Sequence, residues 1–131
     1  MVAKSKTQFI ISPTIAVSMR FPTIKLQELV ILCETYGDKR SKFIARAAYR
    51  QAKRVLANKL PFYEPVKEGP LRDPSMVMST IVVAMRQSYL DLVEQACKRL
   101  HHKLSLFIVW SALAELHRYQ EVGPDQLSFG L

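Results

Sequence analysis

The sequence predicts a mainly helical fold that contains one short two-stranded antiparallel ribbon. Three observations lead to this prediction. One segment of the 131-residue chain occurs twice, each copy begins with alternating polar and apolar residues, and each continues with two helix-like stretches. A chain of this length is expected to form one domain around one core.

The repeat is visible as identical residues at nearly constant spacing. Residues 14–20 match residues 80–86 at five of seven positions, at a spacing of 66. The matches resume at a spacing of 64, which indicates a shortening of two residues in the second copy. They pair Leu26 with Leu90, Cys33 with Cys97, Lys39 with Lys103, Ser41 with Ser105, Phe43 with Phe107, Ile44 with Ile108, Ala48 with Ala112 and Arg54 with Arg118.

Each copy is expected to begin with a half-buried strand. In the first copy this strand covers residues 14–21 and ends at Pro22, and in the second it covers residues 80–86. Ile15, Val17, Met19 and Phe21 point to one side, and Thr14, Ala16, Ser18 and Arg20 point to the other.

Two amphipathic helices are expected after each strand. In the first copy, residues 24–36 form a helix that ends at Gly37, and a second helix runs from a cap at Ser41 towards residue 57. In the second copy, the corresponding helices cover residues 89–100 and 105–119.

The two units therefore span residues 14–57 and 80–121 of one domain. Residues 58–79 contain four prolines and are expected to connect the units. Residues 1–12 are expected to form a basic N-terminal arm, and residues 122–131 a tail. A single strand leaves its backbone groups unpaired, so the two strands are expected to pair antiparallel, with four helices beneath them and a pseudo-two-fold axis.

This pattern resembles the ribbon-helix-helix family of DNA-binding proteins, in which two chains normally supply one strand and two helices each. The resemblance is carried by residues 14–22, by the turn at 37–41 and by the run at 43–48. The second copy departs from the pattern at residues 87–88 and 101–102. Fusion of both units into one chain is similar to accessory proteins of conjugative relaxosomes and of T-DNA border processing on tumour-inducing plasmids.

The resemblance implies that the outward strand residues read base edges in the major groove of double-stranded DNA. A solvated strand face is the simpler alternative. Arg20 and Arg86 have the side chains that bind guanine, and Val82 and Ala84 suit a thymine methyl group. The implied base-reading residues are Thr14, Ala16, Ser18, Arg20, Thr80, Val82, Ala84 and Arg86.

The resemblance also implies that the start of the second helix in each unit binds phosphate, because free backbone N–H groups and the helix dipole favour an anion there. The implied phosphate-binding residues are Lys39, Arg40, Ser41 and Lys42 in the first unit and Lys103 and Ser105 in the second. For both serines, an ordinary helix cap is the simpler alternative, and it is compatible with phosphate binding.

The charge of the chain suits a polyanion but is divided unequally. The formal net charge is +8. Residues 14–57 contain nine basic and three acidic residues, a net of +6, whereas residues 80–121 contain five and four, a net of +1. Helix 105–119 is apolar almost all round, so it is expected either to be deeply buried or to mediate self-association.

The sequence contains no pattern that indicates an enzyme or a cofactor. His101 and His102 are adjacent and His117 is distant, which is not metal-ligand spacing. No phosphate-binding glycine motif is present. Cys33 and Cys97 lack CxxC spacing and are expected to be small buried hydrophobes. No apolar run is long enough to span a membrane, so a cytoplasmic protein is expected.

Three functions fit these features. The first is an accessory factor in plasmid DNA transfer, which binds near a transfer origin or border repeat beside a relaxase or other DNA-processing protein. The second is a transcriptional repressor or plasmid maintenance regulator that uses the same ribbon. The third is a structural interaction protein in which the repeat serves packing and the charge is incidental.

Overall fold

A computed structural model describes residues 13–59 and 75–122, and in it the order strand, helix, helix occurs twice. The elements are β1 (Thr14–Pro22), α2 (Thr23–Thr35), α3 (Arg40–Leu56), β2 (Met78–Arg86), α4 (Gln87–Leu100) and α5 (Leu104–Val122). The prediction of a mainly helical fold with one two-stranded ribbon is confirmed. The expected arm at 1–12, most of the connector and nearly all of the tail lie outside the described residues.

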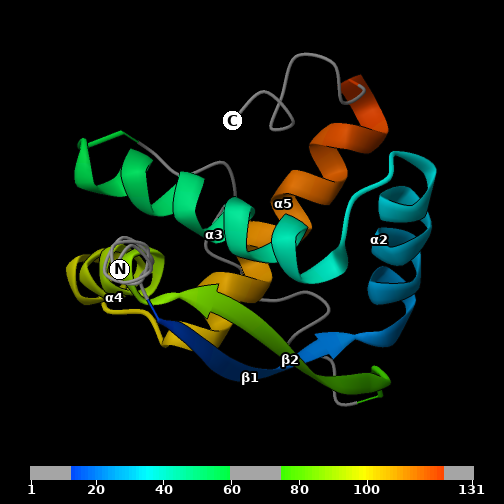
Figure 1. The fold of residues 1–131 in the computed structure, drawn as a ribbon, viewed down its shortest axis with the longest axis horizontal. Helices are drawn as coiled ribbons and strands as arrows, with labels where there is room; N and C mark the ends of the chain where they lie inside the picture. The colour runs from blue at the N-terminus through cyan, green and yellow to red at the C-terminus, as the bar shows by residue number, and fades with distance from the viewer. Residues whose placement is uncertain (1–12, 60–74, 123–131) are drawn as a thin grey trace, which may run out of the picture.

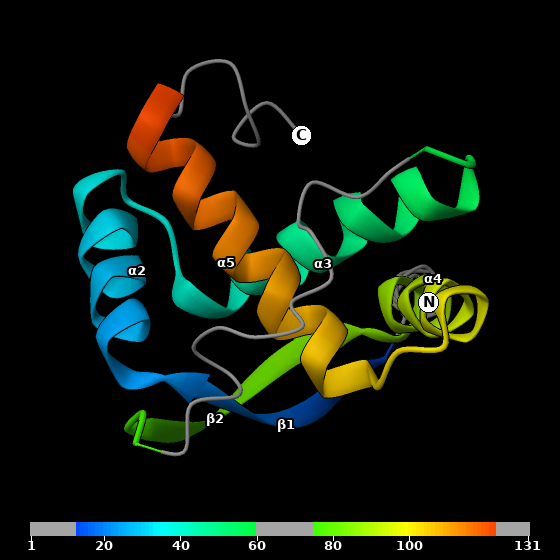
Figure 2. The ribbon, with the colours of Figure 1, turned by 180° about the vertical axis from the view of Figure 1, so that it is seen from behind.

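The two strands form one antiparallel ribbon in which Thr14 lies opposite Arg86 and Pro22 opposite Met78. The ribbon lies along one side of the molecule, and the helices cover its other face (Figure 1). Helices α2 and α4 stand at opposite ends of the ribbon, while α3 and α5 cross between them (Figures 1 and 2).

Equivalent elements of the two halves begin 64 residues apart in every case. The strands begin at Thr14 and Met78, and the helices that follow them begin at Thr23 and Gln87. Strand β2 therefore starts two residues earlier than the identities at a spacing of 66 indicate. A shift of two residues preserves the alternation of a strand, so the polarity pattern alone does not distinguish the two alignments.

The turns between the helices support the same spacing. Gly37 has a φ of +70° and His101 a φ of +59°. The residue after each makes the same hydrogen bond. The backbone N–H of Asp38 donates to the carbonyl of Cys33 (2.8 Å), and the N–H of His102 donates to the carbonyl of Cys97 (3.0 Å). Both helices thus end in the left-handed turn expected at Gly37. The departure of the second copy at residues 101–102 does not change the backbone of this turn.

One hydrophobic core is shared by both halves. The inner face of the ribbon carries five side chains that are at most 5% exposed, namely those of Met19, Phe21, Ile81, Val83 and Met85. These residues belong to one cluster with the buried faces of α3 and α5. Helix α3 packs on β2 and α5 packs on β1, so the core is completed only when the two halves come together.

Helix α5 is buried within this chain, which accounts for its apolar composition. Phe107, Ile108 and Val109 are at most 1% exposed, and Trp110 is 9% exposed. Self-association through residues 105–119 stays a prediction, since a buried helix is the other outcome expected for an apolar sequence of this kind.

Polar groups are also enclosed where α3 and α5 cross. Gln51 is fully buried, and Glu115, 64 residues later, is 2% exposed. The Glu115 carboxylate lies 3.5 Å from the guanidinium of Arg50. This ion pair joins the two halves, and it gives the buried carboxylate the partner that such a group requires.

Candidate nucleic-acid interface

The outer face of the ribbon brings together all eight residues expected to read DNA. Each of them is exposed, whereas the residues between them face the core. They form four cross-strand pairs: Thr14 with Arg86, Ala16 with Ala84, Ser18 with Val82, and Arg20 with Thr80. A ribbon of this kind has the width of the major groove and presents its side chains to base edges.

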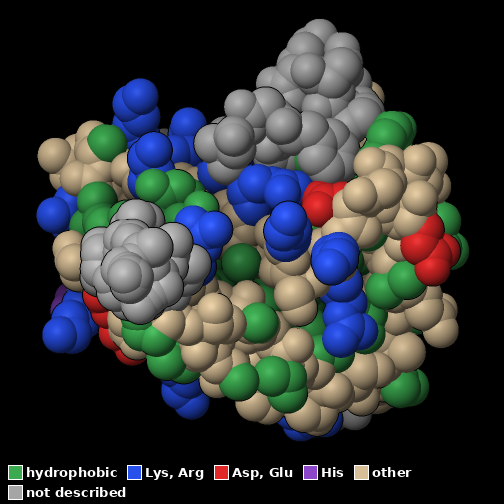
Figure 3. All heavy atoms as spheres, viewed as in Figure 1, with side chains coloured by type: hydrophobic (Ala, Val, Ile, Leu, Met, Phe, Trp, Pro, Cys, Tyr) green, Lys and Arg blue, Asp and Glu red, His purple; other side chains and the backbone are tan. Residues whose placement is uncertain are grey.

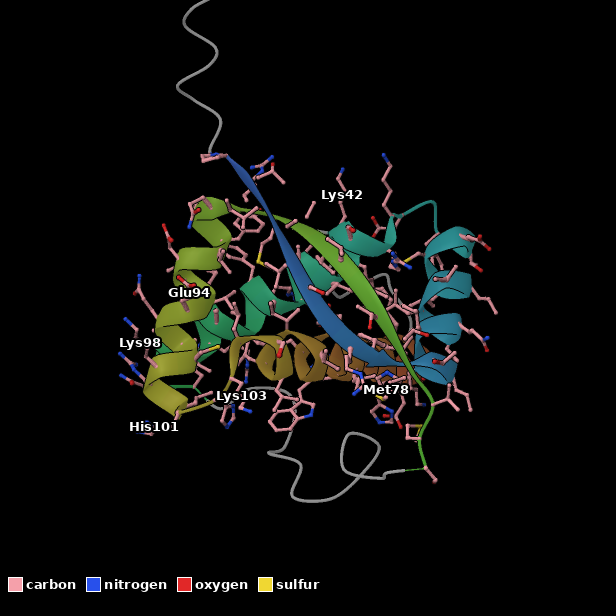
Figure 4. The ribbon with its side chains drawn as sticks, turned by 90° about the horizontal axis from the view of Figure 1, so that it is seen from below. Lys42, Met78, Glu94, Lys98, His101 and Lys103 are labelled. Carbon is pink, nitrogen blue, oxygen red and sulfur yellow. The ribbon has the colours of Figure 1, made fainter. Side chains whose placement is uncertain are left out.

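The two sets of residues expected to bind phosphate lie beside this face. Lys42, at the start of α3, and Lys103, immediately before α5, are on opposite sides of the ribbon when it is viewed from below (Figure 4). Both lysines are exposed. The ribbon face is therefore flanked on each side by the positive end of a long helix and by a cation.

Neither serine caps its helix, so that part of the sequence interpretation is wrong. The N-cap residue of α3 is Lys39, which makes no side-chain capping bond, and Ser41 is the second residue of the helix. Ser105 is likewise the second residue of α5. The first helical hydrogen bonds run from Phe43 to Lys39 (2.9 Å) and from Phe107 to Lys103 (3.0 Å). The N–H groups of residues 40–42 thus have no carbonyl partner within α3.

An acidic residue fixes the turn that precedes α3. The carboxylate of Asp38 accepts the backbone N–H of Lys39 (2.8 Å) and forms an ion pair with Arg46. Its negative charge is therefore engaged by groups within the turn and the helix. The sequence indicates the turn but not this ion pair, which joins residues eight positions apart.

The two helix starts that are expected to bind phosphate differ in charge. The first turn of α3 contains Arg40 and Lys42, whereas the equivalent positions of α5 are Leu104 and Leu106. Lys and Arg side chains gather along α3 from its first turn to its last (Figure 3). The excess of basic residues expected in the first unit thus lies on one side of the ribbon.

A row of stacked side chains adjoins one end of the ribbon, and sequence reasoning missed it. The guanidinium of Arg86 lies 5.8 Å from the centre of the Tyr89 ring, within the range of a cation–π interaction. Tyr89 stacks on Tyr49 at 4.2 Å between ring centres, and the Lys53 ammonium lies 5.3 Å from the Tyr49 ring. The spacing of Arg86 and Tyr89 along the chain is visible in the sequence, but Tyr49 comes from the other half.

The two cysteines are packing residues, as expected. Cys33 and Cys97 are 3% and 6% exposed, and burial raises the pKa of each thiol to about 11. Among residues 13–59 and 75–122, no three His, Cys, Asp or Glu side chains are grouped so that they can hold a metal ion. No helix in this part of the chain is long and apolar enough to cross a membrane.

Comparison with known proteins found no matching family model, curated protein or solved structure. The resemblance to the ribbon-helix-helix family therefore stays a prediction that rests on the residues of this chain.

Proposed function

We propose that this protein binds double-stranded DNA by inserting the β1–β2 ribbon into the major groove. One observation carries the proposal: eight exposed residues form a continuous ribbon face between two cationic helix N-termini. Major-groove readers place a ribbon or a helix against base edges and fix its position through phosphate contacts on either side. A solvated surface does not require this arrangement of cations around a strand pair.

The proposal includes a fold interpretation, namely two ribbon-helix-helix units fused in one chain around a pseudo-two-fold axis. The constant spacing of 64 between equivalent elements supports it. So do two matching hydrogen bonds. The N–H of Thr23 donates to the carbonyl of Val77 (3.0 Å), and that of Gln87 donates to Pro13 (2.7 Å).

The phosphate contacts are assigned to residues at the two helix starts. Lys39, Arg40, Ser41 and Lys42 serve on one side, and Lys103 and Ser105 on the other. Each cation that binds a phosphate releases a counterion from the DNA, so affinity falls as salt rises. Since α3 provides more cations than α5, the first unit holds the backbone more strongly.

Titration of duplex DNA with the full chain at several salt concentrations tests this function. Replacing Arg20 with Ala is expected to reduce the preference for a selected sequence over random duplex by about 1–3 kcal/mol. Lys42→Ala is expected to weaken binding to all duplexes alike. Lys59→Ala removes the same charge beyond the C-terminal end of α3, away from both helix starts, and serves as the control. Duplex binding that is absent, or unaffected by both Arg20→Ala and Lys42→Ala, would refute the proposal.

For the biological role, we propose an accessory factor in plasmid DNA transfer that acts beside a relaxase. The presence of two strand-helix-helix segments in one chain supports this role, because it matches the single-chain type that the sequence resembles. Binding can be compared between duplexes from a transfer origin or border repeat and duplexes from the promoter of the protein's own gene. Preference for the promoter would favour a repressor instead.

A further inference from the structure

The centre of the ribbon follows from the spacing of the two halves. Equivalent strand residues are 64 positions apart, and the paired residues Ser18 and Val82 are themselves separated by 64. A residue that lies opposite its own equivalent lies on the symmetry axis. The axis of the proposed pseudo-dimer therefore passes through this pair, at the middle of the exposed face.

The position of the axis determines which residues of the two strands are equivalent, and these differ from the pairs that sequence identity suggests. The equivalent of Arg20 is Ala84, and the equivalent of Arg86 is Pro22. Sequence identity suggests instead that Arg20 corresponds to Arg86. Arg20 lies two residues from the centre, about 7 Å along the strand, whereas Arg86 lies four residues from it, about 13 Å. The two arginines are therefore not related by the axis.

The reading positions next to the centre have unlike chemistry on the two strands. In β1, Ser18 and Arg20 offer a hydroxyl and a guanidinium, which is the side chain that binds guanine in two places. In β2, the equivalent Val82 and Ala84 offer only aliphatic groups. Val82, in the middle of β2, is 53% exposed. Aliphatic groups in the major groove recognise the thymine methyl group.

Arg86 does not provide β2 with a guanidinium at the position equivalent to Arg20. It is the last residue of β2, and its guanidinium lies 5.8 Å from the ring centre of Tyr89. Tyr89 is in turn stacked on Tyr49. These contacts hold the Arg86 side chain beside the end of the ribbon.

We propose that the two strands read unlike bases: Arg20 of β1 reads a guanine in one half-site, Ala84 of β2 reads a thymine in the other, and Val82 reads a thymine at the centre. This inference rests on the proposed DNA binding. The recognised duplex is consequently asymmetric in base sequence, although the protein that binds it is built from two similar halves.

The test begins with selection of duplexes from a library with a random central segment, using the full chain. Single bases of the selected duplex are then replaced, guanine by 7-deazaguanine and thymine by deoxyuridine. The first change removes the N7 acceptor that an arginine binds, and the second removes only the methyl group. We expect one guanine replacement to weaken binding roughly tenfold in the wild type and to have no effect in Arg20→Ala.

Replacement of the thymine at the centre is expected to weaken binding several-fold in the wild type and in Arg20→Ala, but not in Val82→Ser. The matched gain-of-function variant is Ala84→Arg, which provides the equivalent of Arg20. It is expected to accept an inverted repeat with a guanine in both halves. All of these positions are exposed, so folding is expected to persist and can be verified by circular dichroism.

Selection of an inverted repeat with guanine in both halves by the wild type would overturn the inference while leaving DNA binding intact. Insensitivity to every deoxyuridine replacement would also overturn it. Failure to retain any duplex, in contrast, would refute the proposed function itself.

Discussion

Gly37 and His101 occupy similar turns, but glycine suits the backbone that both adopt better than histidine does. Each has a positive φ, where a side chain clashes with the following carbonyl. His101 is exposed, so its imidazole contributes little packing in return. The histidine at this position therefore costs the second half stability that the first half retains.

His101→Gly is expected to stabilise the protein by about 0.5–1 kcal/mol, because glycine removes the strain of the left-handed conformation. Urea denaturation followed by circular dichroism measures the change. The reverse substitution, Gly37→His, is the matched control and should lower the free energy of unfolding. A loss of stability in His101→Gly would show that the imidazole makes a favourable contact.

Two buried thiols and one buried phenol predict a loss of stability at alkaline pH. Burial raises the pKa of Cys33 and of Cys97 from 9.0 to about 11, and that of Tyr119 from 10.0 to about 12. The folded state keeps these protons after the unfolded state has released them. The free energy of unfolding should therefore be constant with respect to these groups below pH 9 and fall as the pH rises towards 11.

Denaturant titrations at a series of pH values check this expectation, and Cys33→Ala/Cys97→Ala is the control. The double variant should lose less stability than the wild type between pH 9 and 11, since only Tyr119 still contributes. Parallel pH profiles for the two proteins would contradict the assignment of the alkaline loss to the thiols.

At the scale of the elements, the two halves are fastened together at the C-terminal end of α3. The Arg99 guanidinium, on α4, donates to the carbonyls of Val55 (3.2 Å) and Leu56 (3.4 Å) and to the side-chain oxygen of Asn58 (3.1 Å). Carbonyls in the last turn of a helix lack partners within it, and the helix dipole favours a cation there. Arg99 thus acts as a capping group supplied by the other half.

Arg99→Ala is expected to lower the free energy of unfolding by about 1 kcal/mol, through loss of the cap and of its interaction with the dipole. Lys98→Ala is the comparison, because Lys98 is an exposed cation in the same turn of α4. Equal stability of the two variants in urea would indicate that the cap contributes nothing beyond its charge.

For the whole molecule, the unequal charge predicts an unequal dependence on salt. The start of α3 contains Arg40 and Lys42, and the corresponding region of α5 contains Lys103. Each phosphate contact contributes about 0.9 to the slope of log affinity against log salt concentration. Removing cations from the two sides of the ribbon should therefore change this slope by different amounts.

The variant Arg40→Ala/Lys42→Ala is expected to reduce the slope by about two, and Lys103→Ala by about one. Duplex titrations over a range of salt concentrations give both values. If the slopes match that of the wild type, these residues do not bind phosphate, even if the ribbon enters the groove.

Much of the fold and of the candidate interface could be predicted from sequence because both depend on local patterns. The alternation in residues 14–21 identified a strand with one exposed face, and the helical spacing identified four helices near their observed bounds. The same alternation identified all eight residues of the ribbon face. The helix starts were less well predicted, since the expected cap at Ser41 lies inside α3, where Lys39 occupies the cap position without a capping bond.

The sequence by itself determined the order of the elements, the exposed side of each strand and the unequal charge, because each is encoded by residues close together in the chain. Only the tertiary structure decided that Ser18 lies opposite Val82 and that Arg20 lies opposite Thr80. It also decided that α5 is buried within the chain. Pairing across the ribbon joins residues 64 positions apart, and a strand shifted by two residues keeps the same polarity pattern, so local sequence does not specify this register.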